Sequence, residues 1–126
     1  MDARSLARQL AVGRVVIGGA LVVAPALAAR GWIGDVSSTP GARALARGFG
    51  MRDVAIGAGA LAALQSEGNV RDWMLAGAAA DAADLVATIV ARRDLPWLGR
   101  FGIGALATTG ATLSLLAARE VDQPTP

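Results

Sequence analysis

The chain has 126 residues, enough for one domain, and its content of 54% hydrophobic and 17% charged residues is shifted from the usual soluble composition toward that of membrane proteins. It contains no Cys, His or Tyr, which excludes disulfides, thiolate chemistry and the usual zinc and haem ligands, so we expect neither an enzyme nor a bound metal or cofactor. The formal net charge is only +2 and the basic residues are spread along the chain, which argues against a nucleic-acid partner.

The first apolar segment runs from Leu10 to Ala29, with Arg14 as its only charge and Pro25 near its far end. Basic residues precede it and Ala26-Leu27-Ala28 lies within it, so it also resembles a cleavable secretory signal peptide. Because the rest of the chain has the composition of a membrane protein, we expect this segment to be retained as the first membrane span.

Three further apolar segments follow: Ala44 to Leu64, Trp73 to Ala91, and the uncharged run Phe101 to Ala118. About 20 apolar residues are needed to cross a bilayer, and short connections make successive helices antiparallel neighbours. Thr39-Pro40 predicts a capped helix start near Pro40. The sequence therefore predicts an all-α, antiparallel four-helix transmembrane bundle over residues 1–119, with a disordered polar tail at 120–126.

The ends of these segments carry tryptophan and arginine. Trp32, Trp73 and Trp97 all fall at segment ends, where an indole ring suits the membrane interface. Four spans would place two equal sets of arginines on opposite sides, so the positive-inside rule predicts no orientation. One set is Arg4, Arg8, Arg71 and Arg119, and the other is Arg30, Arg43, Arg92 and Arg93.

Charged residues inside the spans are the candidate site. An Arg or Asp at mid-helix costs about 2.5–3.5 kcal/mol on insertion scales, so these residues need partners. Antiparallel packing of the second and third segments places Arg52 and Asp84 at matching depth, and we expect these two to pair. Arg14 and Arg47 lie nearer opposite membrane surfaces, where they could snorkel. The predicted cluster is Arg47, Arg52, Asp53, Asp81 and Asp84, with Arg14 and Thr88 as possible additional members.

Two interpretations of this cluster stay open. Ionisable residues inside a membrane are functional candidates by default, as sites for a substrate, a proton or an ion. Alternatively, the cluster is a structural ion-pair network that fixes the packing of Ala- and Gly-rich helices.

The sequence from Arg47 to Asp53 (RGFGMRD), followed by Gly57 and Leu61, resembles a pattern in small four-helix membrane proteins of actinobacteria. These are domain-of-unknown-function families, distantly similar to the DoxX group. The start of the third segment, Arg71-Asp72-Trp73, and its Asp81/Asp84 pair fit the same pattern. The resemblance covers about the middle half of the chain. It implies the fold and the membrane location, and it implies no activity.

Three functions fit these patterns. The first is an accessory or scaffold component of the cell membrane that acts through helix–helix assembly, as a homo-oligomer or in a larger complex. The second is a minimal carrier, or a proton or ion conduit, that uses the Arg/Asp cluster. The third is a soluble helical interaction domain. The lipid bilayer is the expected partner in the first two.

Overall fold

The computed structural model describes residues 2–66 and 68–121, which are all-helical and contain no strand. The helices are α1 (Ala3–Val23), α2 (Pro25–Ile33), α3 (Pro40–Gln65), α4 (Val70–Val90) and α5 (Gly104–Glu120). A 3₁₀ turn, η1 (Gly34–Ser38), joins α2 to α3, and a π-helical turn, η2 (Gly99–Ile103), leads into α5. The predicted all-helical class is confirmed.

The first predicted span is wrong in its boundaries, because it is divided between two helices. Helix α1 begins at Ala3, where the side chain of Asp2 accepts a hydrogen bond from the Ser5 amide, and it ends at Val23. Ala24 leaves the helical conformation, and Pro25 opens α2 as its first residue. A residue that precedes proline is pushed away from the α region, which explains the break.

The predicted start of α3 is confirmed. Thr39 caps α3 by accepting a hydrogen bond from the Ala42 amide, and Pro40 takes the first helical position. Asn69 caps α4 in the same way, through the Asp72 amide.

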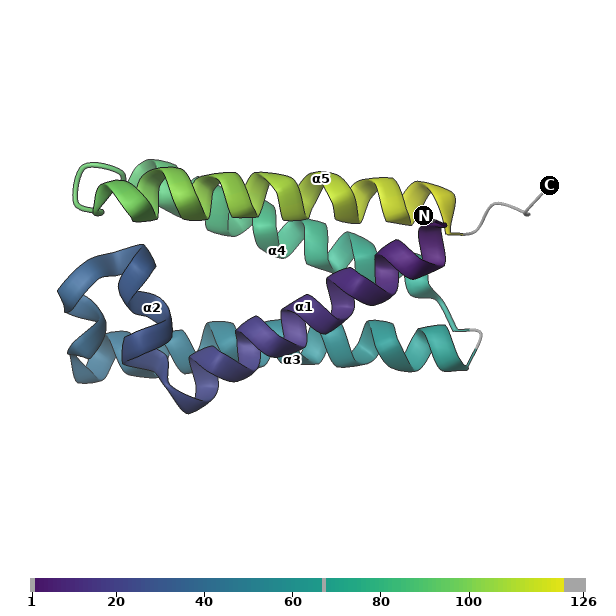
Figure 1. Cartoon of the computed structure of the whole chain (residues 1–126), viewed down its shortest axis with the longest axis horizontal. Helices are drawn as coiled ribbons and strands as arrows, with labels where there is room; N and C mark the ends of the chain where they lie inside the picture. Colours follow the sequence, from purple (N-terminus) through teal and green to yellow (C-terminus); the bar gives the residue numbers. More distant parts are fainter. Residues whose placement is uncertain (1, 67, 122–126) are drawn as a thin grey trace.

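The long helices pack as two antiparallel pairs, α1 with α3 and α4 with α5 (Figure 1). Glycine allows α1 and α3 to cross closely. A Cβ atom added to Gly18 would lie 2.5 Å from the Gly50 carbonyl oxygen, and one on Gly57 would lie 2.5 Å from that of Ala11. Small residues at helix crossings are typical of membrane bundles, where close backbone packing replaces the hydrophobic effect.

The two pairs meet at one end of the molecule and diverge at the other. A cluster of buried residues joins α1, α3, α4 and α5 where α1 begins and α5 ends (Figure 1). We call it the apolar plug, and it comprises Ala7, Ala11, Ala60, Ala63, Leu64, Val70, Met74, Ala117 and Ala118. At the opposite end, α2 folds back between α1 and η2, and Gly99 lies directly against the Trp32 backbone.

Three helical segments are long and apolar enough to cross a membrane: Ala3–Val23, Val70–Val90 and Gly99–Glu120. Helix α3 is not among them, although its 26 residues would extend about 39 Å. Large apolar side chains are exposed on the outside of the candidate spans, for example Val23, Val90 and Phe101. Glu120, predicted to start the tail, is instead the last residue of α5, and residues 122–126 of the predicted tail lie outside the described residues.

Candidate functional site: a charged cluster at the base of a cavity

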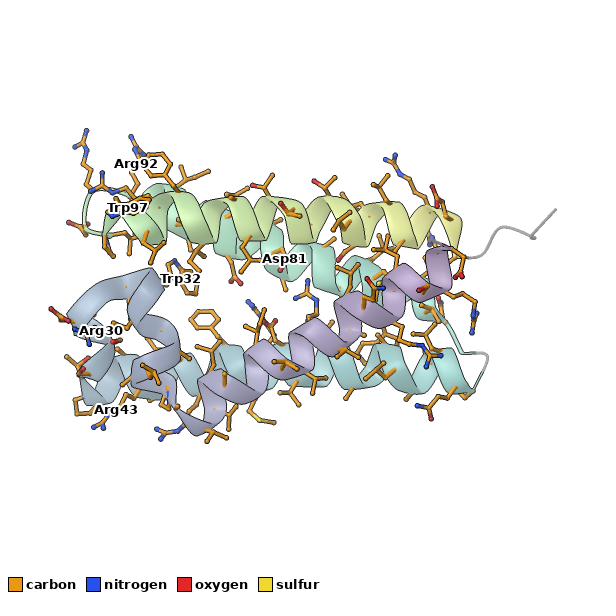
Figure 2. The ribbon with its side chains drawn as sticks, in the orientation of Figure 1. Arg30, Trp32, Arg43, Asp81, Arg92 and Trp97 are labelled. Carbon is orange, nitrogen blue, oxygen red and sulfur yellow. The ribbon has the colours of Figure 1, made fainter. Side chains whose placement is uncertain are left out.

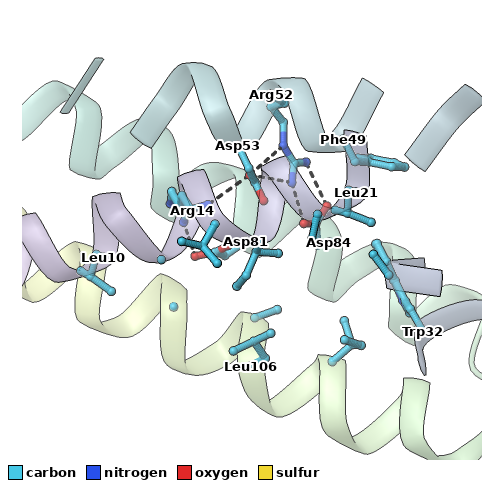
Figure 3. A pocket seen from close by; sticks show the side chains of 18 of the residues that line it. Leu10, Arg14, Leu21, Trp32, Phe49, Arg52, Asp53, Asp81, Asp84 and Leu106 are labelled. Carbon is cyan, nitrogen blue, oxygen red and sulfur yellow. Dashed lines mark hydrogen bonds and ion pairs between the residues drawn. The ribbon is translucent and has the colours of Figure 1, made fainter. Parts of the chain in front are cut away.

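Five charged side chains from three helices meet at one site (Figure 3). One of them, Asp81, lies near the middle of the molecule (Figure 2). Arg14 comes from α1, Arg52 and Asp53 come from α3, and Asp81 and Asp84 come from α4. We call these five residues the charged cluster. Its members lie about halfway along α1 and α4, since Arg14 and Asp81 each lie about 17 Å from the first residue of their helix.

Arg52 and Asp84 form the predicted pair. The two guanidinium nitrogens Nη1 and Nη2 of Arg52 donate to the two carboxylate oxygens of Asp84 at 3.0 and 2.7 Å. This two-bond geometry is the strongest form of the Arg–carboxylate contact. Arg52 also donates to Asp53 at 3.3 Å, so one guanidinium joins α3 to α4 and holds its own neighbour.

Arg14 is central to the cluster, although the sequence placed it near a membrane surface. Its buried guanidinium donates to Asp53 at 3.3 Å, to Asp81 at 2.5 Å and to the Gly77 carbonyl at 2.8 Å. The predicted snorkelling of Arg14 is therefore wrong. Arg14 instead connects the α1–α3 pair to the α4–α5 pair, and cleavage of the first segment after Ala28 would remove it.

Thr88 belongs to a closed series of contacts beside the cluster. Its hydroxyl donates to the Asp84 carbonyl at 2.8 Å and accepts from the indole Nε1 of Trp32 at 3.1 Å. The Trp32 ring lies 5.9 Å from that of Phe49, over which the Arg52 guanidinium sits at 5.3 Å. Because Arg52 also binds Asp84, these contacts form a closed ring. The ring links α2, α3 and α4. Trp32 thus faces the interior of the molecule (Figure 2).

Arg47 is not part of the charged cluster. It is exposed, and its Nε donates to the Val22 carbonyl at 3.3 Å. Arg47 and Arg52 are five residues apart, which separates them by about 140° around a helix, so they cannot share one face. The prediction of a cluster role for Arg47 is wrong, and its position near a membrane surface stays a prediction.

A cavity of about 580 Å³ opens over the charged cluster, between α1 and α5 (Figure 3). Its base is formed by the five charged residues, and its walls are almost entirely apolar. The wall residues are Leu10, Gly13, Val16, Ile17, Ala20 and Leu21 of α1, Ala28, Ala29 and Trp32 of α2, Phe49 of α3, and Ile103, Leu106, Ala107 and Gly110 from η2 and α5; Gln9 is the one polar uncharged member. Sequence reasoning missed this cavity because it arises from the divergence of the helix pairs.

Metal binding at the cluster has no structural support. Among residues 2–66 and 68–121, no group of carboxylates is arranged to hold a metal ion. Each of the three Asp side chains instead contacts at least one guanidinium.

Comparison with known proteins gives no relative: no protein-family model, curated protein or solved structure matches this chain. The resemblance to small actinobacterial membrane proteins of the DoxX type therefore stays a prediction.

Proposed function

We propose that this chain is a small multi-pass protein of the cell membrane that binds a small amphipathic molecule in the cavity between α1 and α5, without catalysis. All four long helices cross the bilayer in this proposal, and α3 does so because its charges are paired with those of α1 and α4. The observation that carries the proposal is the combination of apolar walls and a charged base in a single cavity of about 580 Å³. Ligand pockets commonly have this size and this mixture of surfaces.

The position of the cavity supports entry from the lipid. Both helices that border it are candidate membrane spans. Val16, Ile17 and Leu106 lie among its lining residues and are about half exposed. An opening between two spans faces acyl chains, so a molecule dissolved in the bilayer would reach the charged base by passing these side chains.

The apolar plug favours a binding site over a proton or ion conduit. A conduit needs polar groups or water along the whole membrane, because a charge in an apolar segment is costly. Between the charged cluster and the end where α1 begins, the four helices are packed through buried residues such as Ala11, Met74 and Ala117. The cavity is therefore closed toward the end of the molecule where α1 begins. A closed end is expected of a binding site, and also of a carrier that opens to one side of the membrane at a time.

The assembly function remains a second proposal, since the exposed apolar faces of the spans could contact another protein as well as lipid. Ligand binding takes precedence because assembly does not require a cavity with a charged base.

Binding can be tested with the fluorescence of Trp32, which lines the cavity. The variant Trp73→Phe/Trp97→Phe leaves Trp32 as the only indole and is placed in phosphatidylcholine nanodiscs. Amphiphiles with one phenylbutyl body and different head groups should change its emission saturably. Free tryptophan octyl ester in the same nanodiscs controls for partition into lipid. A response that rises without saturation, or equals that of the control for every head group, would refute a binding site.

A further inference from the structure

The charged cluster contains one more negatively charged side chain than positively charged ones. Three carboxylates (Asp53, Asp81 and Asp84) face two guanidinium groups (Arg14 and Arg52). The other elements around the cavity do not correct this imbalance, because every lining residue from α2, η2 and α5 is uncharged, and α1 adds only the neutral Gln9 to Arg14. Arg47, the nearest remaining base of α3 in sequence, is exposed and bound to Val22.

The excess charge can be assigned to Asp53 and Asp81. Asp84 has both oxygens bound by Arg52 at 3.0 and 2.7 Å, whereas the contact of Arg52 with Asp53 is longer, at 3.3 Å, so Asp84 is the carboxylate that Arg52 chiefly neutralises. Asp53 and Asp81 share Arg14, and each uses a single oxygen for all of its hydrogen bonds: Oδ1 in Asp53 and Oδ2 in Asp81. Within the described residues, the second oxygen of each has no hydrogen-bond partner, and both residues line the cavity.

We infer that the ligand of this cavity is a lipophilic monovalent cation, specifically a protonated amine on an apolar body, whose N–H groups are accepted by the free oxygens of Asp53 and Asp81. This inference rests on the proposed function and names its ligand class. In a low-dielectric site an uncompensated charge is costly, so a single positive charge is what the cluster lacks. The ammonium group supplies donors to carboxylate oxygens that have none, and the apolar body contacts Leu10, Trp32 and Leu106.

The test uses three probes that differ only in head group: 4-phenylbutylamine, 4-phenylbutanol and 4-phenylbutyrate. They are cationic, neutral and anionic at pH 7, and they are titrated against the Trp32-only protein in phosphatidylcholine nanodiscs. Charge-assisted hydrogen bonds predict that the amine binds roughly tenfold or more tightly than the alcohol, and that the acid binds most weakly. Saturable binding of the alcohol or the acid with equal or higher affinity would overturn the inference and leave the proposed function standing. Absence of saturable binding by all three would overturn both.

Asp81→Asn removes the excess charge and keeps an oxygen that can accept from Arg14. The amine should lose its roughly tenfold advantage, while the alcohol should bind as it does to the unmodified protein. Asp35→Asn is the matched control, because the same change is made at an exposed carboxylate paired with Arg30. An amine preference that survives Asp81→Asn would refute the assignment of the charge.

Gln9 gives a second test that does not disturb the ion pairs, since it is exposed and lines the cavity. Gln9→Glu should tighten the binding of the amine severalfold, and Gln9→Lys should weaken it by a similar factor. Identical amine affinities in these two variants would contradict a cation site, even if Asp81→Asn failed to fold.

Discussion

Arg52 on α3 donates two parallel hydrogen bonds to Asp84 on α4, and these two residues hold together helices from the two halves of the molecule. Their side chains are 29% and 17% exposed, so removal of either one leaves a largely buried charge without its partner. We expect Arg52→Ala and Asp84→Ala each to lower the free energy of unfolding by about 3 kcal/mol. The double variant should lose less than the sum, because it leaves no orphan charge. Denaturation in detergent, followed by circular dichroism, measures all three values.

Arg30 and Asp35 provide the control for this cycle. They form an ion pair of 3.0 Å at the surface, with side chains that are 68% and 91% exposed. Their replacement by Ala should cost at most about 1 kcal/mol. Additive effects of Arg52→Ala and Asp84→Ala would mean that the pair is not energetically coupled.

The close crossing of α1 and α3 predicts that two glycines of α3 respond differently to replacement by Ala. An added methyl group at Gly50 would lie 2.5 Å from the Gly18 carbonyl oxygen, so Gly50→Ala must push α1 away. We expect a loss of about 1–3 kcal/mol of stability, as for overpacked interiors. Gly48 has open space around its Cα, so Gly48→Ala should leave stability unchanged or raise it. Thermal unfolding of the two variants in one detergent makes the comparison, and equal melting temperatures would contradict the close crossing.

The three apolar helices and their exposed side chains predict that the protein resides in a membrane. The protein should stay in the membrane pellet after a carbonate wash and should need detergent for extraction. Recovery of a monodisperse protein without detergent would show that a soluble helical domain is the correct alternative.

The C-terminal residues beyond α5 allow a sharp truncation experiment. Removal of residues 122–126, which are polar or proline, should leave the melting temperature unchanged within error. Val121 packs against the apolar plug, so a chain that ends at Glu120 should melt at a lower temperature. If the shorter truncation already destabilises the protein, the polar residues make contacts that their composition does not suggest.

The matching depth of Arg52 and Asp84 could be predicted from the sequence, and the need to pair buried charges favours the helix rotations that turn the two side chains toward each other. Two helices joined by a short connection run antiparallel, and counting residues from the connection gives the depth of each side chain. The same count of residues gave the wrong depth for Arg14. Its helix was expected to begin at Leu10, which placed Arg14 near a membrane surface. The N-cap at Asp2 and the break before Pro25 shift the helix by about two turns and bring Arg14 to mid-depth. Both signals are present in the sequence.

The cavity could not have been predicted from the same patterns. It requires α1 to diverge from α5 and α2 to fold back with Trp32 bound to Thr88. Periodicity and composition describe single helices, whereas the angle between two helices depends on which small residues meet at their crossing. The pairing of Gly18 with Gly50 has no separate sequence pattern in a chain with 16 Gly.

In the proposed membrane topology, the order in which the cluster residues leave the ribosome limits how the protein enters the bilayer. Arg52 is synthesised 32 residues before Asp84, and Arg14 is synthesised 67 residues before Asp81. When α3 is complete, Asp53 can already pair with Arg14 of α1, but Arg52 still lacks Asp84, its two-bond partner on α4, and lipid alone would reject such a helix. We expect the insertion machinery to retain α1 and α3 until α4 has emerged, and to release the helices together once their opposite charges have met.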